Sequence, residues 1–328
     1  MTTAALDPVP ARVHHGGPRL QPAHFEPDRV PAEVTRFGPG GGALGVGRPG
    51  KVGVLELAFE VRGAPGRART ELVHHYQKAP LQIMRPLYFD EARPDLPYTY
   101  LLTTGGGVLH GDRHRTDLTF GPGTSAHVKT QAHTKLYRMD EGYATALVNV
   151  DVGPGAHVEI VPDPVIPYAG SRYFQRTRVT LDPTATFVYG ETLYAGRLSR
   201  GERHEYDVYA TDLDVVRPDG TPLVVDRVRL APDRRRGLAV LDDRDVLASL
   251  YVIAPGVDAT VVADCLHAAL GEAADGSSRF GVSVLPGEVG AWLRLVGDDT
   301  VATSEMTRAA WAAARALLTG RPAPRIRK

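Results

Sequence analysis

The sequence contains a single cysteine, no excess of charge of either sign and no long hydrophobic run. The lone Cys265 excludes an internal disulfide and any metal site built from several thiolates. The 38 Lys and Arg residues balance 38 Asp and Glu residues, which argues against a nucleic-acid-binding protein. No apolar run approaches the roughly 18–20 residues that cross a bilayer, and the first residues lack a signal peptide's apolar stretch. We therefore expect a cytoplasmic globular protein without membrane or nucleic-acid partners.

The apolar content of the chain is sufficient for a substantial core, at 43% of 328 residues. Residues 1–50 differ from the rest, with eight prolines, nine glycines and no sustained period, and this composition predicts a disordered Pro/Gly-rich tail. Residues 51–328 are expected to form one large β-rich domain, because all-β units often exceed about 200 residues. This domain begins with a strand just after Lys51, where apolar residues approximate alternation.

Pro-centred turns recur beyond residue 95, separated by 29 to 37 residues and each preceded by an apolar or alternating run. They are centred on Pro122, Pro154, Pro183, Pro218, Pro255 and Pro286. Proline lacks a backbone donor, so each is expected to end a strand. Unless this spacing is chance, it predicts stacked hairpins or coil-like turns around a shared core. We predict a mainly β fold of stacked or helically arranged antiparallel strands, closed by one or two C-terminal helices.

Two helices are expected near the C-terminus. Asp258 is the expected N-cap of the first, which ends near Gly276, and Ser304 is the expected N-cap of the second, which Gly320 ends. The second helix places its apolar residues on one face, which we expect to be buried. These residues are Met306, Ala310, Trp311, Ala314, Leu317 and Leu318.

Two segments rich in glycine or polar residues are open to more than one interpretation. TTGGGVLHGDR, residues 103–113, has the three glycines of a phosphate cradle but lacks GxxxxGK[ST] and a following helix start, which favours a tight turn before Asp112. TQAHTKLYRMDEG, residues 130–142, fits either a polar cavity wall or a solvated strand face.

Glu191 and Glu202 flank arginines, and such a carboxylate pair fits a surface ion-pair strip or a glycosidase.

Several segments follow one another in the order PLQIMRPLYFD, TTGGGVLHGD, TQAHTKLYRM, EIVPDPVIPYAGSRYFQRTRVTL, YGETLYAGRLSRGE and WAAARALLTGRPAPRIRK. As an ordered set they resemble the urease accessory protein UreD family, called UreH in some organisms. The resemblance covers residues from about 51 to the end, and the N-terminal extension has no place in it.

The resemblance implies a non-enzymatic scaffold or chaperone that helps to deliver nickel to apo-urease. It implies a large β-rich fold and three partners: a UreF-type accessory protein, a UreG-type GTPase bound through UreF, and apo-urease itself. It further implies that nickel crosses the protein through an internal water-filled passage. Ni²⁺ favours imidazole and oxygen donors, and a conduit must bind weakly enough to release it. We therefore expect transient Ni²⁺ and no permanently bound cofactor.

The candidate residues for the passage or for partner contacts are polar side chains of these segments. They are Asp112, Thr130, Gln131, Lys135, Glu159, Asp163, Glu191, Arg197 and Glu202. Among them Asp112 and Glu191 are candidates for weak, transient metal contact, and we expect no catalytic residue and no tight metal ligand. The alternative is a β-rich glycoside hydrolase that uses Glu191 and Glu202.

Overall fold

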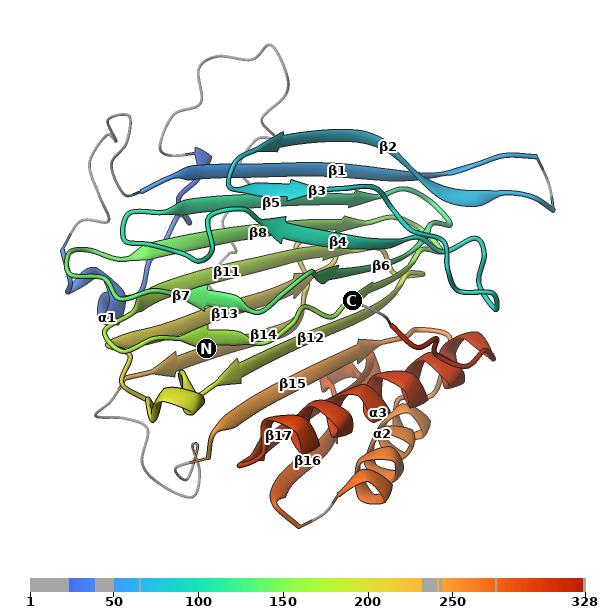
Figure 1. The fold of residues 1–328 in the computed structure, drawn as a ribbon. Coiled ribbons are helices and arrows are strands. Elements are labelled where there is room, and N and C mark those ends of the chain that lie inside the picture. Colours follow the sequence, from blue (N-terminus) through green and yellow to red (C-terminus); the bar gives the residue numbers. More distant parts are fainter. Residues whose placement is uncertain are drawn as a thin grey trace.

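The computed structural model describes residues 24–38, 50–64, 66–231, 241, 244–274 and 276–326. Its strands form two sheets that lie face to face, with two helices against the outer side of one of them (Figure 1). The seven-stranded sheet has the order β14-β13-β11-β8-β5-β1-β2. The main path of the ten-stranded sheet is β16-β17-β15-β12-β9-β6-β4-β3, with β10 and β7 attached beside β12.

The seven-stranded sheet consists of β1 (Val52–Arg62), β2 (Arg69–Lys78), β5 (Arg113–Phe120), β8 (Ala144–Val152), β11 (Arg172–Leu181), β13 (Val208–Val216) and β14 (Pro222–Leu230). The ten-stranded sheet consists of β3 (Leu81–Ile83), β4 (Tyr98–Thr103), β6 (Ser125–Thr130), β7 (Thr134–Leu136), β9 (His157–Ile160), β10 (Val165–Pro167), β12 (Thr186–Tyr194), β15 (Val246–Ile253), β16 (Ser278–Val284) and β17 (Gly290–Gly297). The α-helices are α1 (Ala32–Thr35), α2 (Ala259–Ala273) and α3 (Thr300–Thr319), and the 3₁₀ turns are η2 (Leu198–Arg200) and η3 (Pro286–Glu288).

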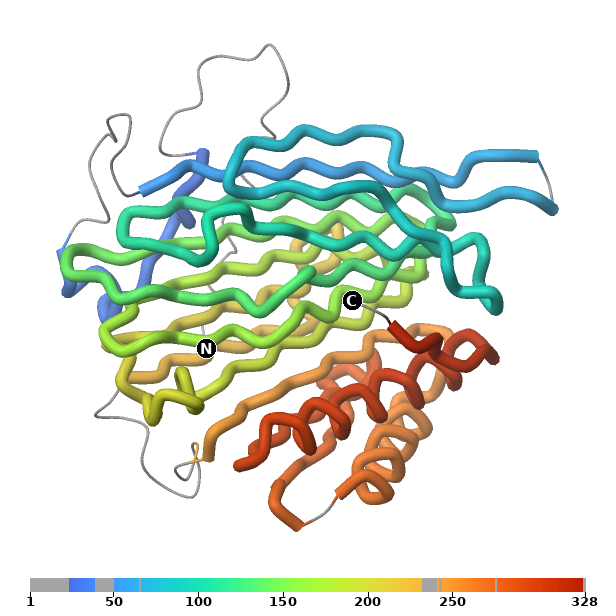
Figure 2. Tube along the Cα trace, in the orientation of Figure 1, coloured from blue at the N-terminus to red at the C-terminus, as the bar shows by residue number. Residues whose placement is uncertain are grey.

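Each Pro-centred turn follows the end of a strand, as predicted, and the first three of them connect one sheet to the other. The chain passes from β5 to β6 at Pro122, from β8 to β9 at Pro154 and from β11 to β12 at Pro183. Gly123 and Gly155 supply left-handed backbone at the first two turns, with φ of +67° and +63°. Each pair of strands is one coil, and Figure 2 shows the coils stacked along the molecule.

The mainly β class, the stacked strands and the C-terminal helices are confirmed, but the direction of pairing in the stack differs from the prediction. The central pairs β5·β8, β8·β11 and β11·β13 are parallel, as are β4·β6, β6·β9 and β9·β12 in the other sheet. Because the chain changes sheet at each turn, equivalent strands of successive coils run the same way. Antiparallel pairing occurs at the ends of the stack, as in β1·β2, β13·β14 and β15·β17.

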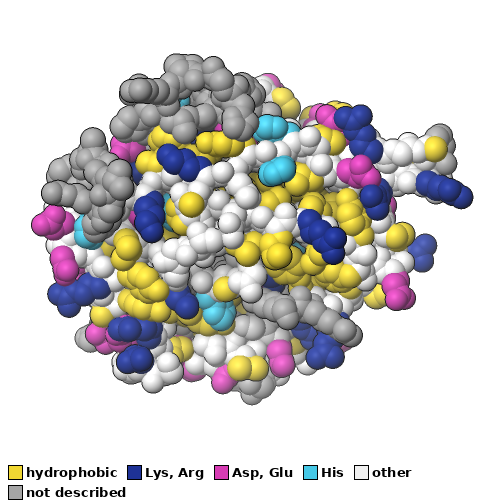
Figure 3. Space-filling view, turned by 45° about the horizontal axis from the view of Figure 1, so that its top comes forward, with side chains coloured by type: hydrophobic (Ala, Val, Ile, Leu, Met, Phe, Trp, Pro, Cys, Tyr) yellow, Lys and Arg dark blue, Asp and Glu magenta, His cyan; other side chains and the backbone are white. Residues whose placement is uncertain are grey.

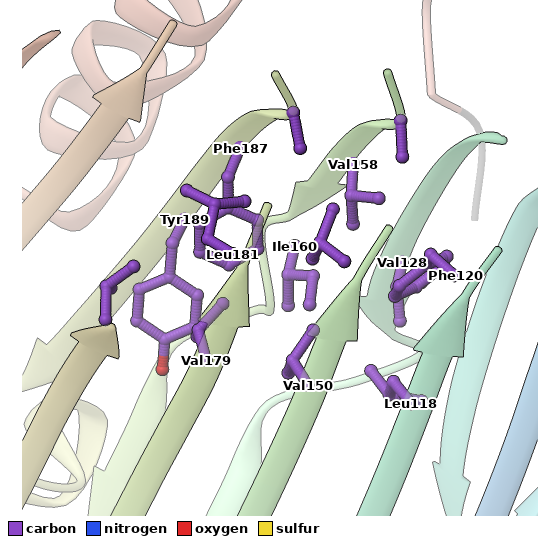
Figure 4. Close-up of a cluster of buried hydrophobic side chains, with 14 of the residues drawn as sticks. Leu118, Phe120, Val128, Val150, Val158, Ile160, Val179, Leu181, Phe187 and Tyr189 are labelled. Atoms are coloured by element: carbon purple, nitrogen blue, oxygen red, sulfur yellow. The ribbon is translucent and has the colours of Figure 1, made fainter. Parts of the chain in front are cut away.

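The main core fills the space between the two sheets at the end where the Pro-centred turns lie. Figure 4 shows Leu118, Val150 and Val179 of one sheet facing Val158 and Phe187 of the other. A second apolar cluster lies on the outer face of the ten-stranded sheet, beneath α2 and α3. Burial of such side chains stabilises each by roughly 1.5–3 kcal/mol, so these clusters fix the position of both sheets and both helices.

The two C-terminal helices match the predicted spans except at the start of the second. Asp258 caps α2 by accepting hydrogen bonds from the backbone N–H groups of Thr260 and Val261, as predicted. The prediction that Ser304 caps α3 is wrong, because Asp299 accepts from the first free N–H groups and the helix begins at Thr300. The hydroxyl of Ser304 instead donates to a carbonyl within the helix, and Gly320 ends it with φ of +64°.

Residues 24–38 differ from the expectation of a disordered tail. Phe25 and Val34 are 2% and 0% exposed, and Val34 packs in a small apolar cluster on the outer side of the seven-stranded sheet. Glu26 pairs with Arg113 at 3.0 Å. The residues on either side, 1–23 and 39–49, lie outside the described part of the chain, so the prediction of a tail applies to them alone.

Candidate functional site

The side chains between the two sheets change from apolar to polar along the strands, away from the Pro-centred turns. In β11 the inward residues Val179 and Leu181 belong to the main core, whereas the inward residues before them are Gln175 and Thr177. A further apolar cluster, which includes Tyr173, closes the far end of this space. The polar side chains therefore form a layer inside the molecule, bounded by apolar residues at each end.

A chain of hydrogen bonds crosses this layer from β11 to β12. The hydroxyl of Tyr173 donates to Gln175 at 3.2 Å, and the amide of Gln175 donates to Thr177 at 3.2 Å. The hydroxyl oxygens of Thr177 and Tyr189 are 3.2 Å apart, and Tyr189 donates to the carboxylate of Glu191 at 2.8 Å. The period of two places these residues on the inward face of each strand. We refer to this set together with Asp226 and Arg294, described next, as the inter-sheet polar layer.

Charged side chains from β14 and β17 complete the inter-sheet polar layer. Asp226 of β14 accepts from Arg294 of β17 at 2.5 Å and from the hydroxyl of Tyr251. Arg294 also donates to Ser249 at 3.2 Å. These contacts join an edge strand of one sheet to the other sheet.

The carboxyl group of Glu191 is the member of the inter-sheet polar layer whose charge changes near neutral pH. Burial raises the pKa of Glu191 to about 7, against the hydrogen bond from Tyr189, and the negative charge of Asp226 adds to the rise. A carboxyl group with such a pKa exchanges its proton readily at neutral pH. An incoming cation can displace that proton into the surrounding water, which makes Glu191 a candidate functional residue.

A second cluster of charged residues lies on the outer side of the ten-stranded sheet, beneath α3. Glu159 of β9 is 0% exposed and accepts from His127 Nδ1 and His157 Nε2 at 2.8 Å each, and from Trp311 Nε1 at 3.0 Å. Arg315 of α3, also fully buried, donates to both oxygens of Glu159. The second guanidinium nitrogen of Arg315 donates to Asp90 at 2.7 Å. We refer to these residues as the Glu159 cluster.

The pKa of Glu159 moves in the opposite direction to that of Glu191. Burial alone would raise the pKa of Glu159, but the hydrogen bonds from His127 and His157 outweigh burial and hold the pKa well below its ordinary value. Burial lowers the pKa of His127 and outweighs the hydrogen bond to Glu159. His127 is therefore a neutral imidazole that donates from Nδ1 and keeps a lone pair on Nε2.

A groove with a volume of about 840 Å³ adjoins the Glu159 cluster. It lies between the outer face of β6, β9 and β12, the helix α3 and the segment after that helix. Its wall includes His127, Asp163, Thr192, Arg308 and Trp311. Of the residues predicted from sequence, Asp163 is the one that lines it.

The structure brings some of the predicted residues together and separates others. The backbone N–H of Asp163 donates to the hydroxyl of Thr130 at 2.8 Å, and the Asp163 carboxylate pairs with Lys129 at 3.1 Å. Gln131 and Lys135 are exposed on the following segment and strand. The structure therefore places Thr130 and Asp163 beside each other, and outside the hydrogen-bonded chain that ends at Glu191.

The contacts of Asp112 are those of a residue that holds a turn. One carboxylate oxygen accepts from the backbone N–H of Lys51 at 2.6 Å and the other from that of Leu109 at 2.9 Å. The predicted tight turns occur at Gly106 and Gly111, whose φ angles are +75° and +74°. Gly107 allows close approach to β7, because a Cβ there would lie 2.8 Å from the carbonyl oxygen of Lys135. These contacts favour the turn interpretation of Asp112 over a role in metal contact.

Glu202 and Glu191 have different surroundings, although sequence alone allowed them to act as a pair. Glu202 forms an ion pair with Arg197, whose guanidinium lies 4.3 Å from the ring centroid of Tyr168, and it also accepts from the backbone N–H of Ala169. Glu191 faces the space between the sheets. Neither carboxylate lines the groove, and this arrangement gives the hydrolase alternative no support.

Sequence reasoning missed Arg315, His127, Asp226 and Arg294. A signal existed for Arg315, since it follows Trp311 by four residues and so lies beside it on the apolar face of a helix. The partners of Asp226 and Arg294 lie on other strands, and no local pattern marks them.

The described part of the chain contains no group of three or more His, Cys, Asp or Glu side chains placed to hold a metal ion. None of its helices is both long enough and apolar enough to span a bilayer. Figure 3 shows basic and acidic side chains scattered among hydrophobic ones over one face, without a field of one sign. The fold and site define a stacked-β protein with an internal polar layer.

Comparison with known proteins identifies the family of this chain. A family model described as UreD urease accessory protein matches residues 51–328. A protein named urease accessory protein UreD 2 from Streptomyces griseus is 50% identical over 289 residues, which cover 87% of this chain and 96% of the relative. The urease accessory protein UreD of Haloarcula marismortui is 40% identical over 285 residues, covering 86% and 92%. That of Cenarchaeum symbiosum is 35% identical over 289 residues, covering 88% and 99%. The chain belongs to the UreD urease accessory protein family.

Proposed function

We propose that this protein is a urease maturation factor that joins apo-urease to a UreF-type accessory protein and, through it, to a UreG-type GTPase. The names of its relatives support a role in urease maturation. In this proposal the protein acts as a scaffold, and Ni²⁺ is its cargo.

The observation that carries the nickel part of the proposal is the inter-sheet polar layer around Glu191. A hydrated cation needs oxygen or nitrogen donors along its path, and an apolar interior offers none. The hydroxyls of Thr177 and Tyr189 and the carboxyl of Glu191 supply such donors between two apolar clusters. The other carboxylate of the layer, Asp226, is paired with Arg294. Because Glu191 and the neutral donors beside it would bind a divalent cation weakly, the layer suits passage and release over storage.

The proton equilibrium of Glu191 fits this role. With a pKa of about 7, the carboxyl is ionised in part of the molecules at neutral pH, and a nearby cation would favour the ionised form. Entry of Ni²⁺ would then release a proton, and its departure would restore the neutral acid. This exchange avoids leaving an uncompensated charge inside the protein.

The test is the amount of nickel per urease active site after activation with a variant of this protein. Glu191→Gln keeps the shape of the side chain but removes its charge, so we expect normal co-elution with the UreF-type partner and apo-urease but a several-fold lower nickel content. The matched control is Glu272→Gln, which removes an exposed carboxylate on α2 and should leave nickel loading unchanged. Nickel is measured by elemental analysis and urease activity in parallel.

Three outcomes separate the parts of the proposal. Wild-type nickel loading by the Glu191 variant would remove this residue from the nickel path. Loss of the complex itself would give Glu191 a structural role. If the wild-type protein and the UreF-type protein elute separately at micromolar concentration, the scaffold role fails.

A further inference from the structure

The groove beneath α3 has an excess of basic side chains at its wall. One acidic residue, Asp163, is among the described residues that line the groove, and its carboxylate is paired with Lys129. Arg308 of α3 and Arg325 of the following segment also line it, and both are exposed. Within the described residues, neither of these arginines has a carboxylate within ion-pair distance. The groove is thus positively charged at its rim.

A residue that lines the groove, His127, has a buried polar atom that lacks a partner among the described residues. His127 is 1% exposed, and its Nε2 makes no hydrogen bond to any of those residues. The Glu159 cluster fixes the other ring nitrogen, so Nε2 is the remaining acceptor of His127, and His127 is one of the residues that line the groove. A buried acceptor left without a donor destabilises a protein, so its presence beside a cavity points to a ligand that donates a hydrogen bond.

The remaining wall is apolar and suits side-chain burial. Trp311 is 4% exposed and borders the groove, together with Val161, Pro162 and Pro164 at the end of β9. The volume of about 840 Å³ lies in the range of sites that enclose a ligand of drug size, about 300–1,000 Å³. The wall therefore combines an apolar surface, a basic rim and one hydrogen-bond acceptor.

We propose that this groove binds an acidic segment of a partner protein in an extended conformation. Its carboxylates pair with Arg308 and Arg325, a backbone N–H donates to His127 Nε2, and an apolar side chain packs against Trp311. Charge complementarity selects an acidic over a basic segment, and the acceptor on His127 selects a peptide, which carries N–H donors, over a bare anion. The groove lies on the opposite side of the ten-stranded sheet from the inter-sheet polar layer, so this inference does not depend on nickel passage.

The test uses the full-length protein and a fluorescein-labelled octapeptide in which leucine alternates with glutamate. Its counterpart has lysine in place of glutamate, and binding is measured by fluorescence anisotropy. We expect the acidic peptide to bind at least about tenfold more tightly than the basic one. The double charge reversal Arg308→Glu with Arg325→Glu should weaken binding of the acidic peptide by about tenfold, since each exposed ion pair contributes up to about 1 kcal/mol.

The matched control is Arg321→Glu, because Arg321 is exposed on the same C-terminal segment but does not line the groove. This variant should bind within about twofold of the wild type. His127→Phe keeps an aromatic ring and removes the acceptor, and it should also weaken binding. Near-ultraviolet circular dichroism verifies that each variant is folded, and the exposed arginine variants decide the result if His127→Phe does not fold.

Four results would overturn the proposal. They are an absence of binding up to millimolar peptide, equal affinity for acidic and basic peptides, unchanged affinity in the double variant, and equal weakening by the Arg321 control. A DNA oligonucleotide that binds as tightly as the acidic peptide, with the same dependence on Arg308 and Arg325, would also overturn it, because the site would then recognise polyanions.

Discussion

Glu159 and Glu191 lie on neighbouring parallel strands, yet they are held in opposite ways. Glu159 points outward beneath α3 and is fully buried, while Glu191 points between the sheets and keeps some exposure. The carboxylate of Glu159 accepts hydrogen bonds from two imidazoles, an indole N–H and a guanidinium. The carboxyl group of Glu191 accepts a hydrogen bond from one phenolic hydroxyl, and the negative charge of Asp226 acts on it. The pKa of Glu159 is lowered, and that of Glu191 is raised to about 7.

The difference shows that the partners of a carboxylate, more than its exposure, decide its charge. The more deeply buried glutamate is the one held ionised, because donors surround both of its oxygens. We interpret the Glu159 cluster as the device that fixes α3 on the sheet. Glu191 lacks such donors and stays free to change its protonation, which the proposed exchange of a proton against Ni²⁺ requires.

The largest effect is expected from breaking the Glu159 cluster. Arg315→Met keeps much of the side-chain length but leaves Glu159 and Asp90 buried without their cation, so it should lower the free energy of unfolding by about 3–5 kcal/mol. Urea denaturation at neutral pH measures this. Arg308→Met, at an exposed position on the same helix, is the control and should change stability by no more than about 0.5 kcal/mol. Equal stability of the two variants would show that the cluster does not hold the helix.

A smaller effect, with a defined pH dependence, is expected from Glu191→Gln. The folded-state pKa of Glu191 lies above its unfolded value, so the native state binds more protons between about pH 4.5 and pH 7. Because Glu191 loses its proton more readily in the unfolded state, the free energy of unfolding of the wild type falls as pH rises through this window. Glutamine does not ionise, so the variant does not lose this stability. Relative to wild type, the variant should gain up to about 3 kcal/mol between pH 5 and pH 8. A stability difference that does not change with pH would contradict the raised pKa.

Much of the stacked architecture was predictable from the sequence, because proline and glycine mark the strand ends. The turns at Pro122, Pro154 and Pro183 delimit the coils. The pairing direction was not predictable, since a turn that crosses between sheets has the same local residues as a hairpin turn within one sheet. The cap of α3 was misplaced for a similar reason: Asp299 and Ser304 are both good caps, and only the packed helix distinguishes them.

The sites depended on contacts between distant parts of the chain, and the sequence identified them unevenly. Glu191 was a candidate and lies in the inter-sheet polar layer, but its neighbour Asp226 comes from the far edge of the other sheet. Arg315 pairs with Asp90, 225 residues away. Phe25 is buried although its surroundings in sequence are rich in proline and polar residues. Composition predicts the average behaviour of a segment, so it does not predict that one side chain of that segment is buried.

The smallest effect sharpens the comparison by making Glu191 more like Glu159. The negative charge of Asp226 contributes to the raised pKa of Glu191, whereas Arg294 lowers it. Asp226→Asn removes that charge and keeps a carbonyl oxygen for the hydrogen bonds from Arg294 and Tyr251. The pKa of Glu191 should therefore fall by a fraction of a pH unit, which a carboxyl carbon-13 NMR titration measures. Asp219→Asn, in the exposed turn of the same hairpin, is the control and should leave it unchanged. An unchanged or higher pKa in the Asp226 variant would mean that burial, without the charge of Asp226, raises the pKa of Glu191. The difference in pKa between Glu191 and Glu159 would then come from the hydrogen-bond donors that Glu191 lacks, and a neighbouring charge would contribute nothing.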